Sequence, residues 1–393
     1  MASVRLRESE QPAITFTETA PRVALVHDWL NQVGGAEDVL QTLVGLYPEA
    51  PIYTSLYWRE KMPAHWKRWD IRTSFIDHLP RAHQHQQLYF PLYPLAFEQF
   101  DFSEYELVIS NKSGFCHGII TGPETVHICY CLTPTRYVWR YRQYAEQENL
   151  GRWTRRALAP ALHYLRLWDR LAAERVDHFI AISQEVRRRI GKLYNRDAVI
   201  IYPPVDTGRF APVDRADNYY LMVGRLVPYR RLDVLIEAFN RLDRPLYIAG
   251  SGRDRDRLEE IAGPNVTFLG YVSDDDLPDL MARCRAFLFP GEEDFGIAPL
   301  QAMAAGRPVI AYAAGGALET VVRGTGVLFS EQSADAIVEV VNSFDPDETD
   351  PDYLRAHARM FDKAVFERKL LAFVEEAMTS SRNKAPSRTN RAR

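Results

Sequence analysis

Short apolar runs alternate with helix-like segments along most of the chain, and this alternation limits the possible folds more than any other feature. Strands that alternate with helices in this way form parallel sheets with helices packed on both faces. The sequence therefore predicts an α/β protein made of Rossmann-like units. The expected strands are residues 22–28, 51–57, 71–76, 106–110, 126–131 and 178–183 in the first half, and 219–226, 245–250, 266–271, 286–290, 308–313 and 326–329 in the second.

A stiff segment divides this pattern in two. Residues 201–206 contain the adjacent prolines Pro203 and Pro204, which prevent a helix from continuing across them. A chain of 393 residues is also longer than one hydrophobic core usually supports. We therefore expect two Rossmann-like domains whose parallel sheets face an inter-domain cleft. The expected parts are a disordered tail at 1–20, a first domain at 21–203, a second domain at 204–363, a helix at about 364–378 that packs back on the first domain, and a disordered basic tail at 380–393.

The segment Gly291–Tyr312 predicts a ligand site at the edge of the second sheet. It follows an apolar run, opens with acidic residues, and continues as a short helix that Pro299 can begin and Gly306 can end. Loops at the carboxyl ends of the strands form the ligand crevice of a doubly wound sheet. Free N–H groups of residues 296–298 would point into that crevice, and Glu293 could accept hydrogen bonds from hydroxyls. Such a loop suits a ligand that carries both phosphate and sugar hydroxyls.

A second group of candidate residues follows the first strand of the second domain. Gly224 permits a tight exit from the sheet, and Arg225 and Arg230 lie at the carboxyl end of the strand. Two guanidinium groups can bind a diphosphate through paired hydrogen bonds. The neighbouring Arg231 is expected to pair with Asp233 or to face solvent. The sequence thus predicts a basic complement to the acidic loop.

In the first domain, Gly34 and Gly35 follow the first expected strand and precede a helix pattern. Glycines at such a place let the backbone approach a ligand closely. The pair by itself is equally compatible with an ordinary turn at the start of a helix. Both interpretations stay open at this point.

The charge and cysteine content exclude some classes of function. The net charge, 48 − 52 = −4, gives no sign of general nucleic-acid binding. Of the four cysteines, Cys129 and Cys131 lie in an apolar run, and no second Cys/His pair has a spacing suited to zinc. We therefore expect core cysteines in a reducing compartment. Residues 274–276 are all aspartate, and we expect them to start a helix rather than to bind a metal.

The sequence predicts no membrane span and no signal peptide, because no apolar run is long enough and residues 1–20 lack an apolar stretch. We therefore expect a cytoplasmic protein whose contact with the inner face of the plasma membrane, if any, is peripheral. Residues 136–170 are rich in arginine and aromatic side chains, which suits contact with anionic lipid headgroups. The alternative is one or two ordinary amphipathic helices with solvated arginines.

Together these motifs resemble glycosyltransferase family 4, and within it the bacterial mannosyltransferases that build polysaccharide and lipopolysaccharide chains. The resemblance covers about residues 21–378 and implies the two-domain GT-B fold, an acceptor-binding first domain, a donor-binding second domain and retention of anomeric configuration. The matching segments are residues 27–30, 34–37, 127–131 and 133–137 in the first domain, and 224–226, 228–230 and 293–306 in the second.

The resemblance also implies roles for single residues. Arg225 and Arg230 match the basic pair that binds the donor diphosphate, although the family usually has lysine at the second position. Glu293 matches the acid that holds hydroxyls of the donor sugar, and these three residues are the catalytic candidates. Gln301 takes the place of a second acid, which holds the nucleotide ribose, but it carries no charge. Further donor-side candidates are Gly34, Gly35, Gly224, Asp294, Phe295, Gly296 and Ile297, and the acceptor-side candidates are His27, Asp28, Ser113, His117 and Arg136.

The function implied by the resemblance is transfer of a hexose, with mannose from GDP-mannose expected, to a lipid-linked or polysaccharide acceptor. In such a reaction the leaving diphosphate takes the acceptor proton, so no cofactor, metal or enzymic nucleophile is required. Two alternatives stay open. One is a nucleotide-sugar epimerase or a phosphorylase of the same fold, and the other is a non-catalytic sugar-binding subunit, which the neutral Gln301 keeps in view.

Overall fold

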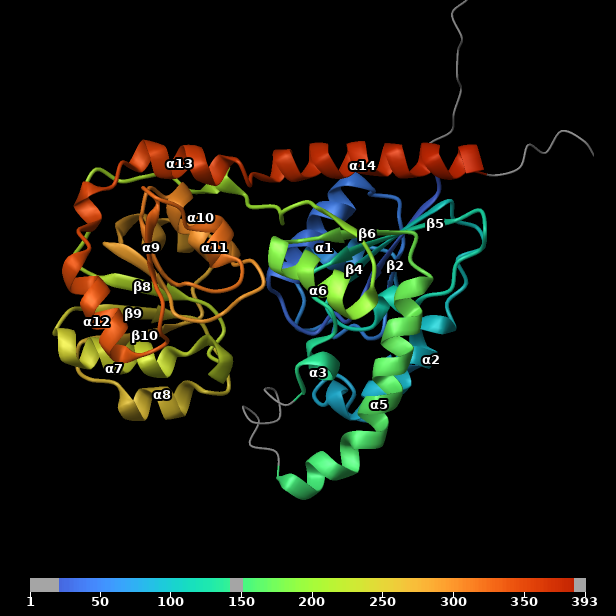
Figure 1. The fold of residues 1–393 in the computed structure, drawn as a ribbon, viewed down its shortest axis with the longest axis horizontal. Helices are drawn as coiled ribbons and strands as arrows, with labels where there is room; N and C mark the ends of the chain where they lie inside the picture. The colour runs from blue at the N-terminus through green and yellow to red at the C-terminus, as the bar shows by residue number, and fades with distance from the viewer. Residues whose placement is uncertain (1–20, 142–150, 385–393) are drawn as a thin grey trace, which may run out of the picture.

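The computed structural model describes residues 21–141 and 151–384, which form two α/β domains placed side by side (Figure 1). The predictions for residues 1–20 and 385–393, and for 142–150 within the arginine-rich region, lie outside the described residues. The expected α/β architecture of two parallel sheets is confirmed.

The N-terminal domain has a seven-stranded parallel sheet in the order β3-β2-β1-β4-β5-β6-β7. Each strand expected in this half is present, and β7 was not expected because it is short and directly precedes the proline-containing segment. The central strands are buried throughout, as parallel strands covered on both faces must be. The strands are β1 Val23–His27, β2 Ile52–Thr54, β3 Ile71–Thr73, β4 Leu107–Lys112, β5 Val126–Cys131, β6 His178–Ala181 and β7 Ala198–Ile200.

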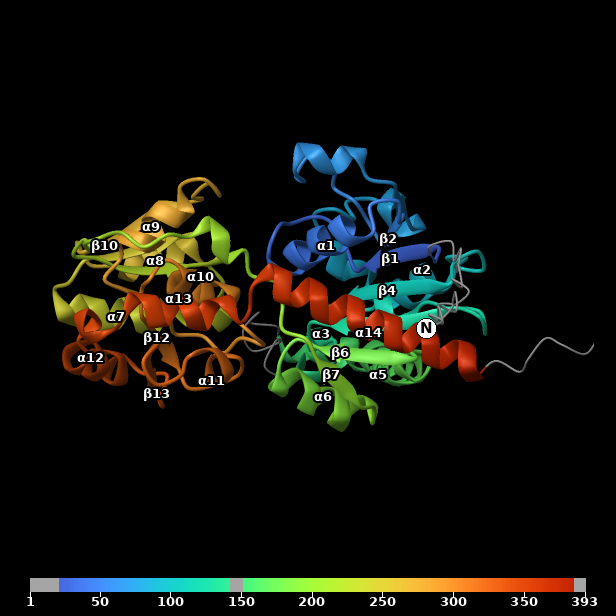
Figure 2. The same ribbon diagram turned by 90° about the horizontal axis from the view of Figure 1, so that it is seen from above.

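Helices cover both faces of this sheet (Figure 2). Helix α1 shows why the sequence forms them, because Val39, Leu40 and Leu43 recur at helical spacing and are all buried. Helix α5 differs from the others, since its N-terminal half extends beyond the body of the domain (Figure 1). The helices are α1 Gly35–Leu46, α2 Tyr93–Glu98, α3 Arg136–Trp139, α5 Arg152–Glu174 and α6 Gln184–Tyr194.

The C-terminal domain has a six-stranded parallel sheet in the order β10-β9-β8-β11-β12-β13. All of its strands lie within the runs expected from the sequence. They are β8 Tyr220–Val223, β9 Leu246–Ala249, β10 Val266–Gly270, β11 Ala286–Phe289, β12 Val309–Tyr312 and β13 Gly326–Phe329. The helices are α7 Leu232–Leu242, α8 Arg255–Ile261, α9 Leu277–Arg283, α10 Ile297–Ala304, α11 Ala317–Thr320, α12 Ala334–Ser343 and α13 Pro351–Arg359.

The chain passes between the domains twice, and the two crossings are hydrogen-bonded to each other. Val205 donates to the Phe361 carbonyl at 3.1 Å, and Lys363 donates to the Val205 carbonyl at 2.9 Å. Helix α14, Lys363–Lys384, then runs back along the N-terminal domain and continues past the expected end at residue 378 (Figure 1).

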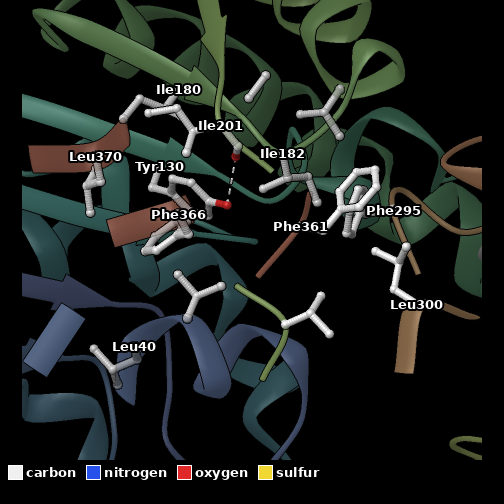
Figure 3. Close-up of a cluster of buried hydrophobic side chains, with 14 of the residues drawn as sticks. Leu40, Tyr130, Ile180, Ile182, Ile201, Phe295, Leu300, Phe361, Phe366 and Leu370 are labelled. Atoms are coloured by element: carbon white, nitrogen blue, oxygen red, sulfur yellow. Dashed lines mark hydrogen bonds between the residues drawn. The ribbon is translucent and has the colours of Figure 1, made fainter. Parts of the chain in front are cut away.

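The face of α14 that meets the N-terminal domain belongs to a large apolar cluster (Figure 3). Phe366 packs edge-on against Tyr130 of β5, with ring centroids 5.5 Å apart, and the Tyr130 hydroxyl donates to the Ile201 carbonyl at 3.0 Å. The same cluster reaches Phe295 and Phe361 at the crossing between the domains. One continuous buried surface therefore connects both sheets.

Candidate active site

The strand order places the ligand-binding edge of each sheet in the same region. In both domains the order reverses beside the first strand, between β1 and β4 and between β8 and β11. Ligands of doubly wound sheets bind outside the carboxyl ends of the strands at this point. The loop after β1 and the start of α1 meet the loops after β8 and β11 across the inter-domain boundary, and α3 and α6 also contact the loop after β11.

At the centre of this region Arg230 faces Glu293. Arg230 Nη2 lies 3.2 Å from Glu293 Oε1, and the side chains are 17% and 14% exposed. The contact lacks hydrogen-bond geometry, and both Glu293 Oε1 and Arg230 Nε are buried without a hydrogen-bond partner among the described residues. Buried polar groups are costly when unsatisfied. The pair therefore has spare capacity for a polar ligand, with an acceptor on one side and a cation on the other.

Glycines make the room for this pair. Gly224 has a φ of +156°, and a Cβ there would lie 2.5 Å from Arg230 Nη1. A Cβ at Gly250 would lie 1.9 Å from the Gly224 carbonyl oxygen, and one at Gly291 would lie 2.9 Å from Arg230 Cα. Gly250 was not among the sequence candidates, although a Gly-Ser-Gly segment directly after an expected strand could have indicated it.

Arg225 reaches toward the other domain. Its guanidinium donates to Gln32 Oε1 at 3.1 Å and to the Tyr229 hydroxyl at 2.9 Å. Arg231 instead pairs with Asp233 at 3.1 Å and does not enter the site, one of the two outcomes expected. Of the three arginines of this loop, the structure thus brings Arg225 and Arg230 to the inter-domain boundary.

The structure confirms the helix-start interpretation of the Gly34–Gly35 pair, and the close approach of a ligand stays a prediction. The Gly34 carbonyl accepts from the N–H groups of Glu37 and Asp38 and so begins α1. A Cβ at Gly35 would lie 3.1 Å from Ile297 Cδ1 of the C-terminal domain. Gly34 therefore forms the helix-start turn, whereas Gly35 permits the close approach of the two domains.

The acidic loop is held by glycines on its other side. Gly316 donates to the Glu293 carbonyl at 2.9 Å, and a Cβ at Gly315 would lie 2.1 Å from that same oxygen. Gly296 has a φ of +89°, and a Cβ there would lie 2.8 Å from Phe289 Cζ. Sequence reasoning identified Gly296 but missed Gly315 and Gly316, which follow the next strand of the sheet.

Two other donor-side candidates lie next to this loop. The Phe295 side chain is buried and stacks on Tyr202, with ring centroids 5.5 Å apart, so only its backbone is available to a ligand. Gln301 lies on α10 and is partly buried. Their contacts with a donor stay predictions.

The acceptor-side candidates His27 and Asp28 are buried and fully engaged. His27 Nδ1 accepts from Asn111 Nδ2 at 3.2 Å, so His27 Nε2 carries the proton and donates to Glu37 Oε1 at 3.3 Å. The Asp28 carboxylate accepts the backbone N–H groups of residues 113–116 at 2.6–2.8 Å, and the Ser113 hydroxyl at 3.2 Å. Asp28 and Ser113 therefore fix the shape of the loop after β4.

His117 does not line the cleft, and its assignment to the acceptor side is wrong. The side chain is completely buried inside the N-terminal domain, where Nε2 lies 3.2 Å from the Asp169 carbonyl oxygen and the ring stacks on Tyr194. Burial, reinforced by the Lys112 ammonium, lowers the pKa of His117 well below its usual value. The residue follows Ser113 closely in the sequence, but the turn after β4 carries it inward.

Asp294 and Arg136 meet each other across the domain boundary. The Asp294 carboxylate pairs with the guanidinium groups of Arg136 and Arg189, both from the N-terminal domain. Burial opposes the charge of Asp294, but these two arginines outweigh it and lower the pKa of the carboxyl. A donor contact from Asp294 would have to compete with both ion pairs. Sequence reasoning missed Arg189, which carries no local motif.

No group of three or more His, Cys, Asp or Glu side chains suited to a metal occurs in residues 21–141 and 151–384. Ser273 and Asp276 instead form the start of α9, where the Asp276 N–H donates to Ser273 Oγ at 3.2 Å. All four cysteines are free and buried, as expected of core residues. None of the described helices is long and apolar enough to cross a membrane.

Residues 209–361 match a family model described as "Glycosyl transferases group 1", and this stretch contains Arg225, Arg230 and Glu293. The match covers most of the C-terminal domain. The predicted resemblance to mannosyltransferases is confirmed at modest identity. Over 198 residues the chain is 31% identical to the GDP-mannose-dependent monoacylated alpha-(1-6)-phosphatidylinositol monomannoside mannosyltransferase of Corynebacterium glutamicum, which covers 42% of this chain and 52% of that protein. It is 28% identical over 159 residues to the O-antigen chain mannosyltransferase RfbU of Salmonella typhimurium, and this match covers 37% of this chain and 45% of that protein.

The chain spans about half the length of the curated relatives it matches. Solved structures of glycosyltransferases match almost the whole chain and confirm the GT-B fold. The Anabaena protein Alr3699/HepE, solved in complex with UDP, has a TM-score of 0.68 at 18% identity and covers 90% of this chain and 100% of its own. The sucrose-phosphate synthase of Thermosynechococcus elongatus has a TM-score of 0.69 at 18% identity, and the match covers 91% of this chain and 99% of that one.

Proposed function

We propose that this group 1 glycosyltransferase transfers mannose from GDP-mannose, with retention of configuration, to a lipid-linked or polysaccharide acceptor. The observation that carries the proposal is the partly buried Arg230–Glu293 pair at the switch point of the donor domain, with Arg225 beside it. Its cation and carboxylate suit the diphosphate and the sugar hydroxyls of one ligand. The relatives named GDP-mannose-dependent support this donor, and RfbU, named an O-antigen chain mannosyltransferase, supports a polysaccharide acceptor.

In the proposed mechanism the protein stabilises charge rather than supplying a nucleophile. As the bond from the sugar to the diphosphate breaks, Arg225 and Arg230 stabilise the negative charge that grows on the phosphate oxygens. Glu293 accepts hydrogen bonds from sugar hydroxyls and orients the ring. The acceptor hydroxyl attacks the same face and gives its proton to the leaving phosphate oxygen. The engaged state of His27 and Asp28 supports a proton acceptor that belongs to the donor.

A panel of GDP-, UDP-, ADP- and TDP-sugars tests the donor, because a ligand that binds the folded state raises its melting temperature. The largest shift in melting temperature is expected with GDP-mannose. In a second assay, the protein should transfer mannose in the presence of native membranes. Epimer formation without acceptor, or phosphate-dependent sugar release, would instead indicate an epimerase or a phosphorylase. Donor binding with neither transfer nor hydrolysis would indicate a sugar-binding subunit.

Helix α5 is the part of the chain we propose to contact anionic lipid, at the cytoplasmic face of the plasma membrane. Trp153, near the start of α5, is 73% exposed, and Leu167, in its C-terminal half, is 54% exposed. The first acidic residue of α5 is Asp169, which is buried. A second copy of such a basic helix would be repelled, whereas anionic headgroups would be attracted. The basic residues of α5 are Arg152, Arg155, Arg156, Arg166 and Arg170, and its exposed apolar residues are Trp153, Leu158, Tyr164, Leu167 and Leu171.

Sedimentation with vesicles tests this contact. The protein should bind vesicles that contain phosphatidylglycerol but not neutral vesicles, and binding should weaken as salt is raised. Replacing Trp153 and Leu167 by serine should abolish binding, whereas Tyr271→Ser, at an exposed site in the other domain, should leave it unchanged. Equal sedimentation of both variants would contradict the assignment of the surface to α5.

A further inference from the structure

The residues on either side of Glu293 are both bound by the other domain. Glu292 Oε1 accepts from Arg140 at 3.0 Å and from Arg189 at 3.3 Å. The two Asp294 oxygens are bound separately, one by Arg136 and the other by Arg189. We call these ion-paired residues the clamp: Glu292, Asp294, Arg136, Arg140 and Arg189. Glu293 itself, between the two bound carboxylates, faces Arg230 of its own domain.

Arg189 is the shared member of the clamp, and its guanidinium is used on every side. Nε donates to Glu185 of the same helix, α6, at 2.8 Å, while Nη1 and Nη2 reach Asp294 and Glu292. The side chain is 11% exposed. A planar guanidinium held by three carboxylates has little freedom to rotate. Arg189 therefore fixes the positions of both acidic side chains relative to α6.

Arg136 is fixed by a separate network beneath α3. The preceding residue, Thr135, donates to Asp169 Oδ1 at 2.6 Å, and Trp139 Nε1 donates to Asp169 Oδ2 at 2.6 Å. Arg166 of α5 also donates to the Val138 carbonyl at 3.0 Å. Helix α3 is thus anchored on α5, and Arg136 extends from this base to Asp294.

We propose that Arg136 and Arg189 are positioning residues that act through Glu292 and Asp294 to hold Glu293 in place for the donor sugar when the domains close. The proposal rests on the proposed function, because it takes a nucleotide sugar as the ligand. In this account the ion pairs from the N-terminal domain shape the donor site through the loop that carries Glu293. We call the arrangement in which the clamp is formed the closed arrangement. Sugar transfer then requires this arrangement, whereas binding of the nucleoside diphosphate by Arg225 and Arg230 does not.

Three variants test the clamp: Arg189→Gln, Asp294→Asn and the double variant. Misplacement of a reacting group by about 1 Å can cost ~100-fold in rate, so each single variant should lower kcat about 10- to 100-fold. The dissociation constant for GDP, measured by calorimetry, should change less than about threefold, since binding requires no closure. The loss in the double variant should be smaller than the product of the two single losses, because both single variants remove the Arg189–Asp294 ion pair.

Arg188→Gln is the matched control, since Arg188 is the neighbouring arginine on α6, is largely exposed, and pairs with Glu185 of its own helix. Its kcat should equal that of the wild type. Independent, multiplicative losses in the double variant, an unchanged kcat in Arg189→Gln, or an equal loss in the control would overturn the proposal. Circular dichroism checks folding, and if Arg189→Gln does not fold, Asp294→Asn alone decides the question.

Small-angle scattering without any substrate separates this proposal from the proposed function. The wild type should match the closed arrangement, and Arg189→Gln should have a larger radius of gyration at physiological salt. If the wild type transfers no sugar, the proposed function fails, and scattering still decides whether the clamp closes the domains. If the wild type transfers sugar and the variants do so equally well, the clamp proposal fails by itself.

Discussion

The Arg230 guanidinium fills the space that a side chain at Gly224 would need, because a Cβ at Gly224 would lie 2.5 Å from Arg230 Nη1. The glycine therefore has a specific reason to be at the end of β8, beyond its φ of +156°. Its absence of a side chain lets the guanidinium lie against the strand end and face Glu293. This relationship ties a backbone feature directly to the proposed diphosphate site.

Gly224→Ala should displace the Arg230 guanidinium and strain the backbone. We expect GDP binding to weaken about tenfold, which corresponds to ~1.4 kcal/mol, with a modest fall in melting temperature. Gly45→Ala is the control, because a Cβ at Gly45, within helix α1, meets nothing within 4 Å. Equal GDP affinity in Gly224→Ala and the wild type would show that Arg230 does not bind the diphosphate.

Arg225→Ala should weaken GDP binding by about 1.5–3 kcal/mol, the range for hydrogen bonds to charged groups. Arg231→Ala removes the neighbouring arginine that pairs with Asp233, and it should bind GDP as the wild type does. Calorimetry on both variants gives the comparison. If Arg225→Ala and Arg231→Ala lose the same amount of GDP affinity, Arg225 has no specific role in binding and our assignment of it is wrong.

Asp28→Asn should destabilise the fold rather than change the chemistry, because the carboxylate accepts four backbone N–H groups of the loop after β4. Loss of its charge should lower the free energy of unfolding by about 2–4 kcal/mol. Asp101→Asn, at an exposed carboxylate that accepts from the Ser103 N–H, should cost far less. Urea titrations measure both, and a stable Asp28→Asn protein with lost transfer would instead favour a direct role.

Buried neutral histidines should make the protein sensitive to acid. Burial lowers the pKa of His127 to about 3 in the folded state, and it also lowers the pKa of His117. Because the unfolded chain binds these protons near pH 6.5, the stabilisation is complete above that pH and declines below it by about 1.4 kcal/mol per pH unit for each histidine.

His127→Gln should therefore flatten the dependence of the free energy of unfolding on pH between pH 6.5 and pH 5. His65→Gln, at an exposed histidine, is the control for the substitution itself. Urea titrations across this pH range compare the two variants with the wild type. An unchanged slope in His127→Gln would show that this residue does not titrate on unfolding.

Sequence reasoning succeeded where the information is local. Arg225, Arg230 and Glu293 lie in loops that follow strands, and parallel strands bring such loops to one edge of the sheet. The alternation of apolar runs similarly predicted the strands of both sheets. Local patterns could also place Gly296, because a glycine between a strand and a helix indicates a special turn.

The same reasoning failed where contacts join distant parts of the chain. Arg189 and Asp294 are 105 residues apart and come from different domains, so no spacing rule connects them. His117 lies only a few residues beyond a strand, but a short turn directs it into the core. Strand β7 ends directly before the proline-containing segment 201–206, whose sequence indicates the break between the domains.

The most direct test of the central claim compares the wild type with Glu293→Gln, using labelled GDP-mannose and native membranes as the acceptor source. We predict that the wild type transfers mannose with retained configuration, and that Glu293→Gln is about 100-fold slower while it still binds GDP. Wild-type transfer that the substitution leaves undiminished, or no transfer from any sugar of the nucleotide panel, would contradict the account.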